Sequence, residues 1–174
     1  MIKLLVGIVV VAAVSTAGDY AWFELGLGNH QMTAGIIHGA VLLTAVGAVF
    51  GASAGRLLLG LPIGTIAGVG GALAYYAIVG PGRRNMAMVA AWAICWLILA
   101  ALDGRLLRRP ARSFAEIGGR GLAAAVLGGL SFWMMLGTLW GNEADTQRNY
   151  LMQFAAWTVA WAPGILAIGV GATT

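Results

Sequence analysis

The sequence predicts an all-α integral membrane protein, a bundle of six transmembrane helices with both termini in the cytoplasm. Hydrophobic residues make up 60% of the chain and charged residues only 9%, whereas about 25% of residues are charged in soluble domains. The 174 residues leave room for about six spans of roughly 20 residues each. Most of the basic residues fall in segments that alternate spans would place on one side of the membrane, namely Lys3, Arg56, Arg105, Arg108, Arg109, Arg112 and Arg120.

The segment 103–120 orients the predicted bundle, because it holds half of all the Lys and Arg residues. Short basic loops stay on the cytoplasmic side during insertion. Ser113-x-x-Glu116 has the pattern of a capping box, so we expect a short helix here that lies in the membrane interface. We expect the basic side chains of this segment to contact anionic lipid headgroups at the cytoplasmic face, namely Arg105, Arg108, Arg109, Arg112 and Arg120. Three arginines fall on the opposite, extracytoplasmic side in this topology, namely Arg83, Arg84 and Arg148.

The chain is predicted to form one membrane domain over residues 1–174. The approximate spans are 4–22, 31–55, 57–79, 85–102, 121–140 and 150–171. Residues 1–17 also have the three parts of a secretory signal, but we interpret them as part of the first span. Glycines recur every four residues in the second and third spans, which lets two helix backbones approach closely, so these spans are expected to pack together.

Recognised enzyme motifs are absent, since the sequence has no phosphate-binding loop, zinc-binding His-Glu pair, nucleophile elbow or cysteine pair. The sequence therefore gives no indication of an enzyme, and it identifies no cofactor. The net charge of +4 could suggest nucleic acid as a partner. The basic residues, however, lie in loops beside apolar runs, which positive-inside topology explains, so we expect no nucleic-acid partner.

Five tryptophans lie deeper in the predicted spans than the interfacial Trp22 and Trp140. At about 1.5 Å of rise per residue, Trp92, Trp133 and Trp157 lie about 10 Å below the outer surface, and Trp96 and Trp161 about 16 Å. Two pairs are four residues apart, so each pair shares one helix face. An indole N–H is costly in hydrocarbon without a partner, which favours the bundle interior. These rings either fill space opposite the glycines, line a cavity open to the outer half, or face lipid.

His38 is an ionisable group inside a span, which makes it a candidate for function, although a structural hydrogen bond is the alternative. Asp19, at the outer end of the first span, is its expected acidic partner, and the two could form a proton-linked pair near neutral pH. Tyr75 lies at a similar depth. A metal site formed with Glu24 and His30 was considered, but two histidines eight residues apart on one helix are about 12 Å apart, so no metal is predicted.

The chain length and the number of spans resemble those of the substrate-binding subunits of energy-coupling-factor vitamin transporters. Ala13-x-x-x-Ala17 is similar to the small-residue contact in their first helix. The resemblance covers topology and this one pattern, and it implies no ligand-binding residue.

We therefore predict a transporter or binding component for a small, partly apolar solute that enters from the extracytoplasmic side. The expected ligand-binding residues are Asp19, His38, Tyr75, Trp92, Trp96, Trp133, Trp157 and Trp161. The alternative is a non-catalytic subunit or assembly factor of a larger membrane complex, or a homo-oligomer, in which the glycines form contact surfaces. The expected location is the cytoplasmic (inner) membrane of a prokaryote.

Overall fold

The structure is a computed structural model that describes all residues except 27–30, 81, 83, 139–148 and 172–174. Every regular element in the described residues is helical. The elements are α1 (Ile2–Glu24), α2 (Gln31–Ser53), α3 (Leu57–Ile78), α4 (Arg84–Leu102), the π-helical turn η2 (Asp103–Leu107), α5 (Phe114–Thr138) and α7 (Tyr150–Gly169). Six of these helices are long and apolar enough to cross a membrane. The prediction of an all-helical membrane bundle is confirmed at this level.

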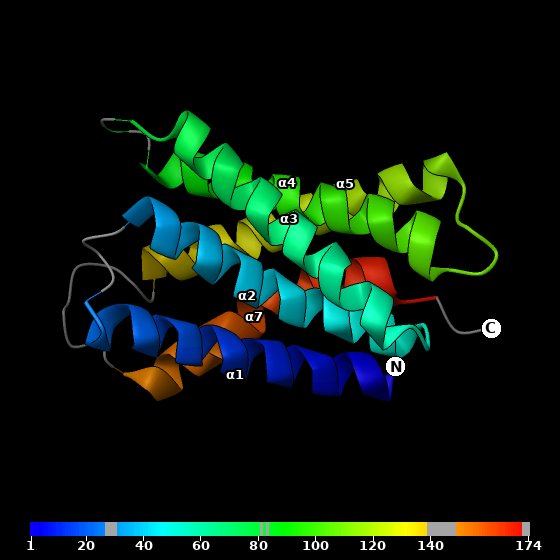
Figure 1. Ribbon diagram of the computed structural model, residues 1–174, viewed down its shortest axis with the longest axis horizontal. Coiled ribbons are helices and arrows are strands. Elements are labelled where there is room, and N and C mark those ends of the chain that lie inside the picture. Colours follow the sequence, from blue (N-terminus) through cyan, green and yellow to red (C-terminus); the bar gives the residue numbers. More distant parts are fainter. Residues whose placement is uncertain (27–30, 81, 83, 139–148, 172–174) are drawn as a thin grey trace.

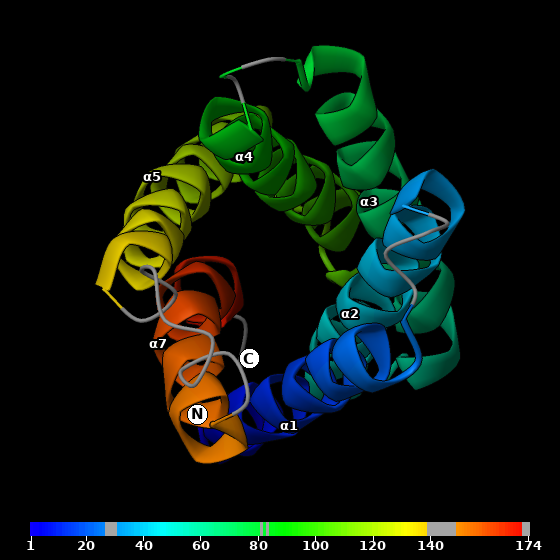
Figure 2. The same ribbon diagram turned by 90° about the vertical axis from the view of Figure 1, so that its left-hand side faces the viewer.

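The six long helices form a closed ring. Each helix packs against the next one along the chain, and α7 packs against α1 to close the ring, as the end-on view in Figure 2 shows. The helices run up and down, so the N-terminus and the end of α7 lie at the same end of the bundle (Figure 1). We call this end, which also holds Arg56 and the segment 103–113, the terminal end. The other end, where α1 finishes and α7 begins, is the opposite end.

Glycines bring α2 and α3 into direct backbone contact. A Cβ atom on Gly51 would lie 2.9 Å from the Cα of Gly60, and a Cβ on Gly47 would lie 2.7 Å from the Cα of Gly64. No side chain larger than hydrogen fits between the two backbones at these points. Thr44 and Thr65 add a hydroxyl contact of 2.7 Å across the same interface. This pair of helices therefore forms one rigid side of the ring.

The helix α5 begins earlier than predicted. The backbone N–H of Glu116 donates to the Oγ of Ser113 at 3.2 Å, and the backbone N–H of Ser113 donates to the Glu116 carboxylate at 3.1 Å. These reciprocal bonds are the predicted capping box, but the helix they cap is α5 itself. The separate interfacial helix expected here is therefore wrong, because Gly118 and Gly119 continue the helix and do not interrupt it.

Candidate functional site

Two polar residues of α1 meet two tryptophans of α7. The indole Nε1 of Trp161 donates to the Oγ of Ser15 at 2.8 Å, and the Nε1 of Trp157 donates to the carboxyl group of Asp19 at 2.6 Å. Both pairs are spaced by four residues, so each pair lies on one helix face, and the antiparallel helices align them as two successive contacts. Ser15 and Asp19 are buried. This double contact closes the ring between its first and last helices.

His38 on α2 lies beside the same carboxyl group. Its Nε2 is 3.7 Å from Asp19 Oδ1, which is within ion-pair range but too long for a hydrogen bond. Its ring meets Trp22 edge to face, with centroids 5.8 Å apart. A Cβ on Gly18 would lie 2.9 Å from the Cε1 of His38, so the imidazole needs a glycine at this position of α1. Three helices thus meet at Asp19.

Trp157 and Trp161 also belong to a larger group of rings, which we call the aromatic cluster. The cluster joins α4, α5 and α7. Trp92 stacks on Phe132 with centroids 4.3 Å apart, and it lies 4.4 Å from the ring of Trp161. Trp157 and Trp161 stack at 5.8 Å. The members of the aromatic cluster are all buried, and they are Trp92, Trp96, Phe132, Trp157 and Trp161.

Two indole N–H groups of the aromatic cluster have no acceptor. Within the described part of the chain, the Nε1 atoms of Trp92 and Trp96 are buried and make no hydrogen bond. Leaving such a donor unsatisfied costs about 1–3 kcal/mol. Trp96 packs closely against the backbone of Gly128 and Gly164. The glycines on α5 and α7 therefore make room for its ring, and these are not the repeating glycines of the second and third spans that the packing interpretation placed opposite the tryptophans.

The other residues of the predicted site lie elsewhere. Trp133 is 52% exposed on the outside of the ring, so the expectation that all five deep indoles face the interior is wrong for this residue. Tyr75 is half-buried on α3 and meets Tyr76 edge to face, with centroids 5.0 Å apart. Among the described residues no three His, Cys, Asp or Glu side chains gather as a metal site requires. His30 and Trp140, which the sequence analysis singled out, lie outside the described residues.

At the terminal end, Asp103 and two arginines form a buried charge cluster, which we call the anchor. Arg108 makes two hydrogen bonds to the Asp103 carboxylate, at 2.7 and 3.0 Å, and Arg112 makes one at 3.1 Å. Asp103 is completely buried. Arg112 also donates to the carbonyl of Ile168 at 2.9 Å, and burial lowers the pKa of its guanidinium while the Asp103 charge opposes that change. The anchor thus joins the turn after α4 to the end of α7.

The predicted contact with lipid headgroups is wrong for Arg108 and Arg112, because their guanidinium groups are buried and bonded to Asp103. It remains a prediction for Arg105 and Arg109, which are exposed. Arg105 lies over the ring of Phe114, 4.7 Å from its centroid.

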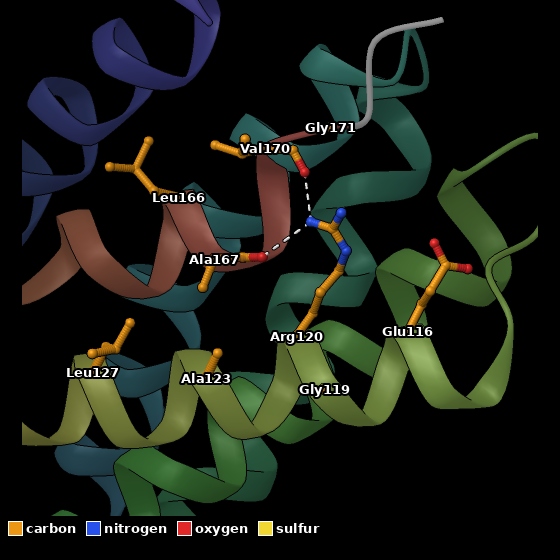
Figure 3. A pocket seen from close by; sticks show the side chains of 9 residues that line it. All are labelled: Glu116, Gly119, Arg120, Ala123, Leu127, Leu166, Ala167, Val170 and Gly171. Atoms are coloured by element: carbon orange, nitrogen blue, oxygen red, sulfur yellow. Dashed lines mark hydrogen bonds between the residues drawn. The ribbon is translucent and has the colours of Figure 1, made fainter.

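Arg120 lies at one end of an open groove between α5 and α7. Its Nη1 donates to carbonyls in the last turn of α7, at 3.1 Å for Ala167, and Figure 3 shows this contact at the groove. The groove holds about 600 Å³. Most of its lining is apolar or small, and the lining residues are Glu116, Gly119, Arg120, Ala123, Leu127, Leu166, Ala167, Val170 and Gly171. A carboxylate and a guanidinium therefore lie toward one end of the groove, and the rest of its lining is apolar or small (Figure 3).

The sequence analysis missed Ser15 and Asp103. Ser15 precedes Asp19 by four residues, and Trp157 precedes Trp161 by the same number. This equal spacing could have predicted two paired contacts between the first and last helices. Asp103 is the first residue of the arginine-rich segment. Counting the basic residues of that segment predicts only its side of the membrane and gives no information about an acidic partner. Both residues are polar and buried. Ser15 bonds a tryptophan 146 residues later in the chain, and Asp103 bonds arginines five and nine residues after it.

Comparisons of the chain with protein-family models, curated proteins and solved structures found no match. The fold and the contacts define the class: a six-helix membrane protein whose ring is closed by buried polar contacts beside a set of stacked tryptophans. Beyond this class, the function has to be inferred from the site itself.

Proposed function

We propose that the protein binds a small, partly apolar solute inside the membrane and transports it or delivers it to a partner. In this proposal both termini are cytoplasmic, and the solute enters from the extracytoplasmic side, at the opposite end. The protein is placed in the cytoplasmic membrane of a prokaryote. Asp19 and His38 act as a proton-linked pair at the solute site, and the aromatic cluster forms its apolar wall.

One observation carries the proposal: Trp157 contacts Asp19 of the proton-linked pair and is also a member of the aromatic cluster. Its Nε1 donates to Asp19 at 2.6 Å, and its ring stacks with Trp161 at 5.8 Å. A change in the charge of Asp19 therefore acts directly on a ring of the aromatic cluster, and a change in the charge of His38 acts on it through Asp19. Ionisable side chains are costly within a span, and where they occur they mark proton or substrate pathways.

The exposure of His38 also supports entry from the opposite end. Its side chain is 25% exposed, compared with 12% for the side chain of Asp19. The imidazole is therefore the more accessible member of the pair. A proton or a solute that reaches His38 has Asp19 as its next polar contact.

The proposal is tested by identifying the solute and then removing the pair. The protein is purified in detergent, and native mass spectrometry is used to detect small molecules that stay bound. Binding of the detected solute is measured from pH 5 to pH 8 for the wild type, Asp19→Asn and His38→Gln. We expect binding by the wild type to vary with pH and both variants to lose this dependence.

Glu116→Gln is the matched control, because it also replaces a carboxyl group by an amide but lies at the terminal end. Gln is accepted at this position of a capping box, so the fold of the control is preserved. The control should keep the pH profile of the wild type. If Asp19→Asn and His38→Gln both retain wild-type affinity and pH profile, the proton-linked pair is excluded from the site.

The second candidate function, a subunit of a larger membrane complex, is favoured by a different observation. The repeating glycines of the interface between α2 and α3 face each other within the chain, so they leave no surface for a partner, and they are Gly39, Gly47, Gly51, Gly60, Gly64 and Gly68. Gly119 and Ala123, however, line the open groove between α5 and α7, and a Cβ on Gly119 would meet nothing within 4 Å. Isolation of the protein in a mild detergent with a stoichiometric partner would support this function. A monomer with retained solute would contradict it.

A further inference from the structure

Arg120 places a positive charge at one end of the open groove between α5 and α7 (Figure 3). Its Nη1 donates to the carbonyls of Ala167 at 3.1 Å and Ile168 at 3.4 Å, and also to that of Val170. Within the described part of the chain, its Nε and Nη2 make no hydrogen bond and its guanidinium forms no ion pair. These two nitrogens form one edge of the planar group, and such an edge matches two oxygens of a phosphate.

The anchor adds positive charge beside this end of the groove. Arg112 of the anchor donates to the carbonyl of Ile168 at 2.9 Å, the same oxygen that Arg120 contacts. The two guanidiniums are therefore neighbours. Asp103, the carboxylate of the anchor, is already bonded to Arg108 and Arg112 and forms no ion pair with Arg120. The anchor thus supplies Arg120 with a second cation and with no bonded counter-charge.

Glu116, the one acidic residue in the lining of the groove, does not neutralise Arg120 either. Its Oε2 accepts from the backbone N–H and the Oγ of Ser113 at 3.1 and 3.0 Å, and it forms no ion pair with the guanidinium. Figure 3 shows the carboxylate beyond Arg120, on the side away from Leu127. An anionic group is therefore the partner that this half-buried guanidinium lacks among the described residues.

The rest of the groove has the shape and direction of a lipid chain. Arg120 reaches the carbonyl of Val170, the first residue after α7, so its charge lies level with the end of that helix, where headgroups meet a bilayer. From there the lining follows α5 to Ala123 and Leu127, about 10 Å further along the helix axis. Leu127 is 49% exposed and Val170 39%, so the groove is open to its surroundings. Its volume of about 600 Å³ is ample for a ligand.

We propose that the groove between α5 and α7 binds an anionic phospholipid, with the phosphate at Arg120 and one acyl chain along Ala123 and Leu127. Basic pockets between transmembrane helices bind such lipids. The sequence predicted headgroup contact for Arg120, and the groove adds a place for the chain. The inference goes beyond the proposed solute site, which lies at the opposite end. A second copy of the protein packed on the groove is the competing occupant.

The test measures lipid bound to the purified protein by native mass spectrometry, which also gives the oligomeric state. Phosphatidylglycerol and phosphatidylcholine with identical acyl chains are titrated separately, because they differ in net charge and share the apolar part. Gly119→Leu fills the groove, and Gly118→Leu is the matched control. A Cβ on either glycine would meet nothing within 4 Å, so both leucines fit the fold, but only Gly119 lines the groove.

We expect the wild type to be a monomer that binds phosphatidylglycerol about fivefold more tightly than phosphatidylcholine, the effect of one arginine on an anionic lipid. Gly119→Leu should lose the binding of both lipids at this site, and Gly118→Leu should retain it. Arg120→Gln should lose the preference for phosphatidylglycerol and still bind phosphatidylcholine. Arg109→Gln, which removes an exposed charge at the same end, should keep the preference.

The proposal is overturned if the two leucine variants bind phosphatidylglycerol alike, or if the wild type binds both lipids equally. It is also overturned if the wild type is a dimer that Gly119→Leu converts to monomers, because the groove then holds a second copy. Arg120→Gln also loses the bonds to α7, and if it fails to fold, the leucine pair decides. Neither leucine variant touches Asp19 or His38, so failure of the lipid site leaves the solute proposal standing, and the reverse also holds.

Discussion

The two ends of the bundle hold their helices together in different ways. At the terminal end, the anchor places a completely buried carboxylate, Asp103, between two arginines at hydrogen-bond distance. At the opposite end, Asp19 is 8% exposed, receives one indole N–H and lies 3.7 Å from a histidine. Arginine stays protonated in proteins, whereas histidine changes charge near neutral pH.

This difference indicates which end of the bundle has contacts that can respond to a change in pH. The anchor pairs a buried carboxylate with two arginines and joins the turn after α4 to the end of α7. The contacts of Asp19 involve groups that can gain or lose a proton, and they lie beside the stacked tryptophans. A protein that opens on one side only would need this asymmetry.

The largest effect is expected from Asp103→Asn. The variant leaves two buried guanidiniums without their counter-charge, and breaking a buried ion pair in this way costs about 3–5 kcal/mol. The free energy of unfolding is measured by SDS titration of the purified protein. Arg109→Gln, which removes an exposed charge from the same segment, is the control and should change stability by no more than about 0.5 kcal/mol. A loss below about 1 kcal/mol for Asp103→Asn would show that the anchor is not the stronger end.

A smaller effect is expected from Trp157→Phe at the opposite end. The substitution leaves the Asp19 carboxyl group without its indole donor and should cost about 1–3 kcal/mol. Trp161→Phe removes the same atoms from the neighbouring contact, where Ser15 still bonds the carbonyl of Val11 at 2.8 Å, and should cost less. The same unfolding titration compares the two variants. Equal losses would mean that the acidic contact contributes no more than the hydroxyl contact.

Ser113→Ala should cost about 1 kcal/mol, the usual effect of losing a helix N-cap side chain. The change lies next to the anchor but leaves its charges in place, so it separates the contribution of the cap from that of the ion pairs. Thermal unfolding followed by circular dichroism measures the difference. A loss as large as that of Asp103→Asn would show that the start of α5, and not the buried charge, stabilises the terminal end.

The smallest effect on stability is expected from Asp19→Asn. The amide oxygen can still accept the N–H of Trp157, so the free energy of unfolding should change by less than about 1 kcal/mol. This variant nevertheless removes the charge that faces His38. Unfolding titration of wild type and variant in parallel gives the difference. A loss comparable to that of Asp103→Asn would contradict the contrast between the two ends.

Position along each helix was predictable from the sequence, but direction around each helix was not. The rise per residue is fixed in a helix, so counting along the spans placed His38 in the outer part of its span and Asp19 at the outer end of the first, and the structure brings the two side chains within 3.7 Å. Counting alone does not say which way a side chain faces. Trp133 has the depth of Trp92 and lies on the outside of the ring, 52% exposed.

The anchor was not predictable for a related reason. The π-helical turn η2 and the chain after it bring Arg108 and Arg112 to Asp103, and the α-helical spacing of three or four residues does not predict these contacts. A count of basic residues treats Arg108 and Arg112 as equal to Arg105 and Arg109. The structure separates them, since the first two face an internal carboxylate. The capping box at Ser113 was recognisable, but the length of the helix after it was not.

The contact between α1 and α7 has a consequence for how the protein is made. Ser15 and Asp19 enter the membrane with the first helix, and their indole partners follow 146 and 138 residues later in the chain. Because chains are synthesised from the N-terminus, a carboxyl group waits in the bilayer without its indole donor until the last helix arrives. A chain that ends before Trp157 would therefore lack both contacts that join the first helix to α7.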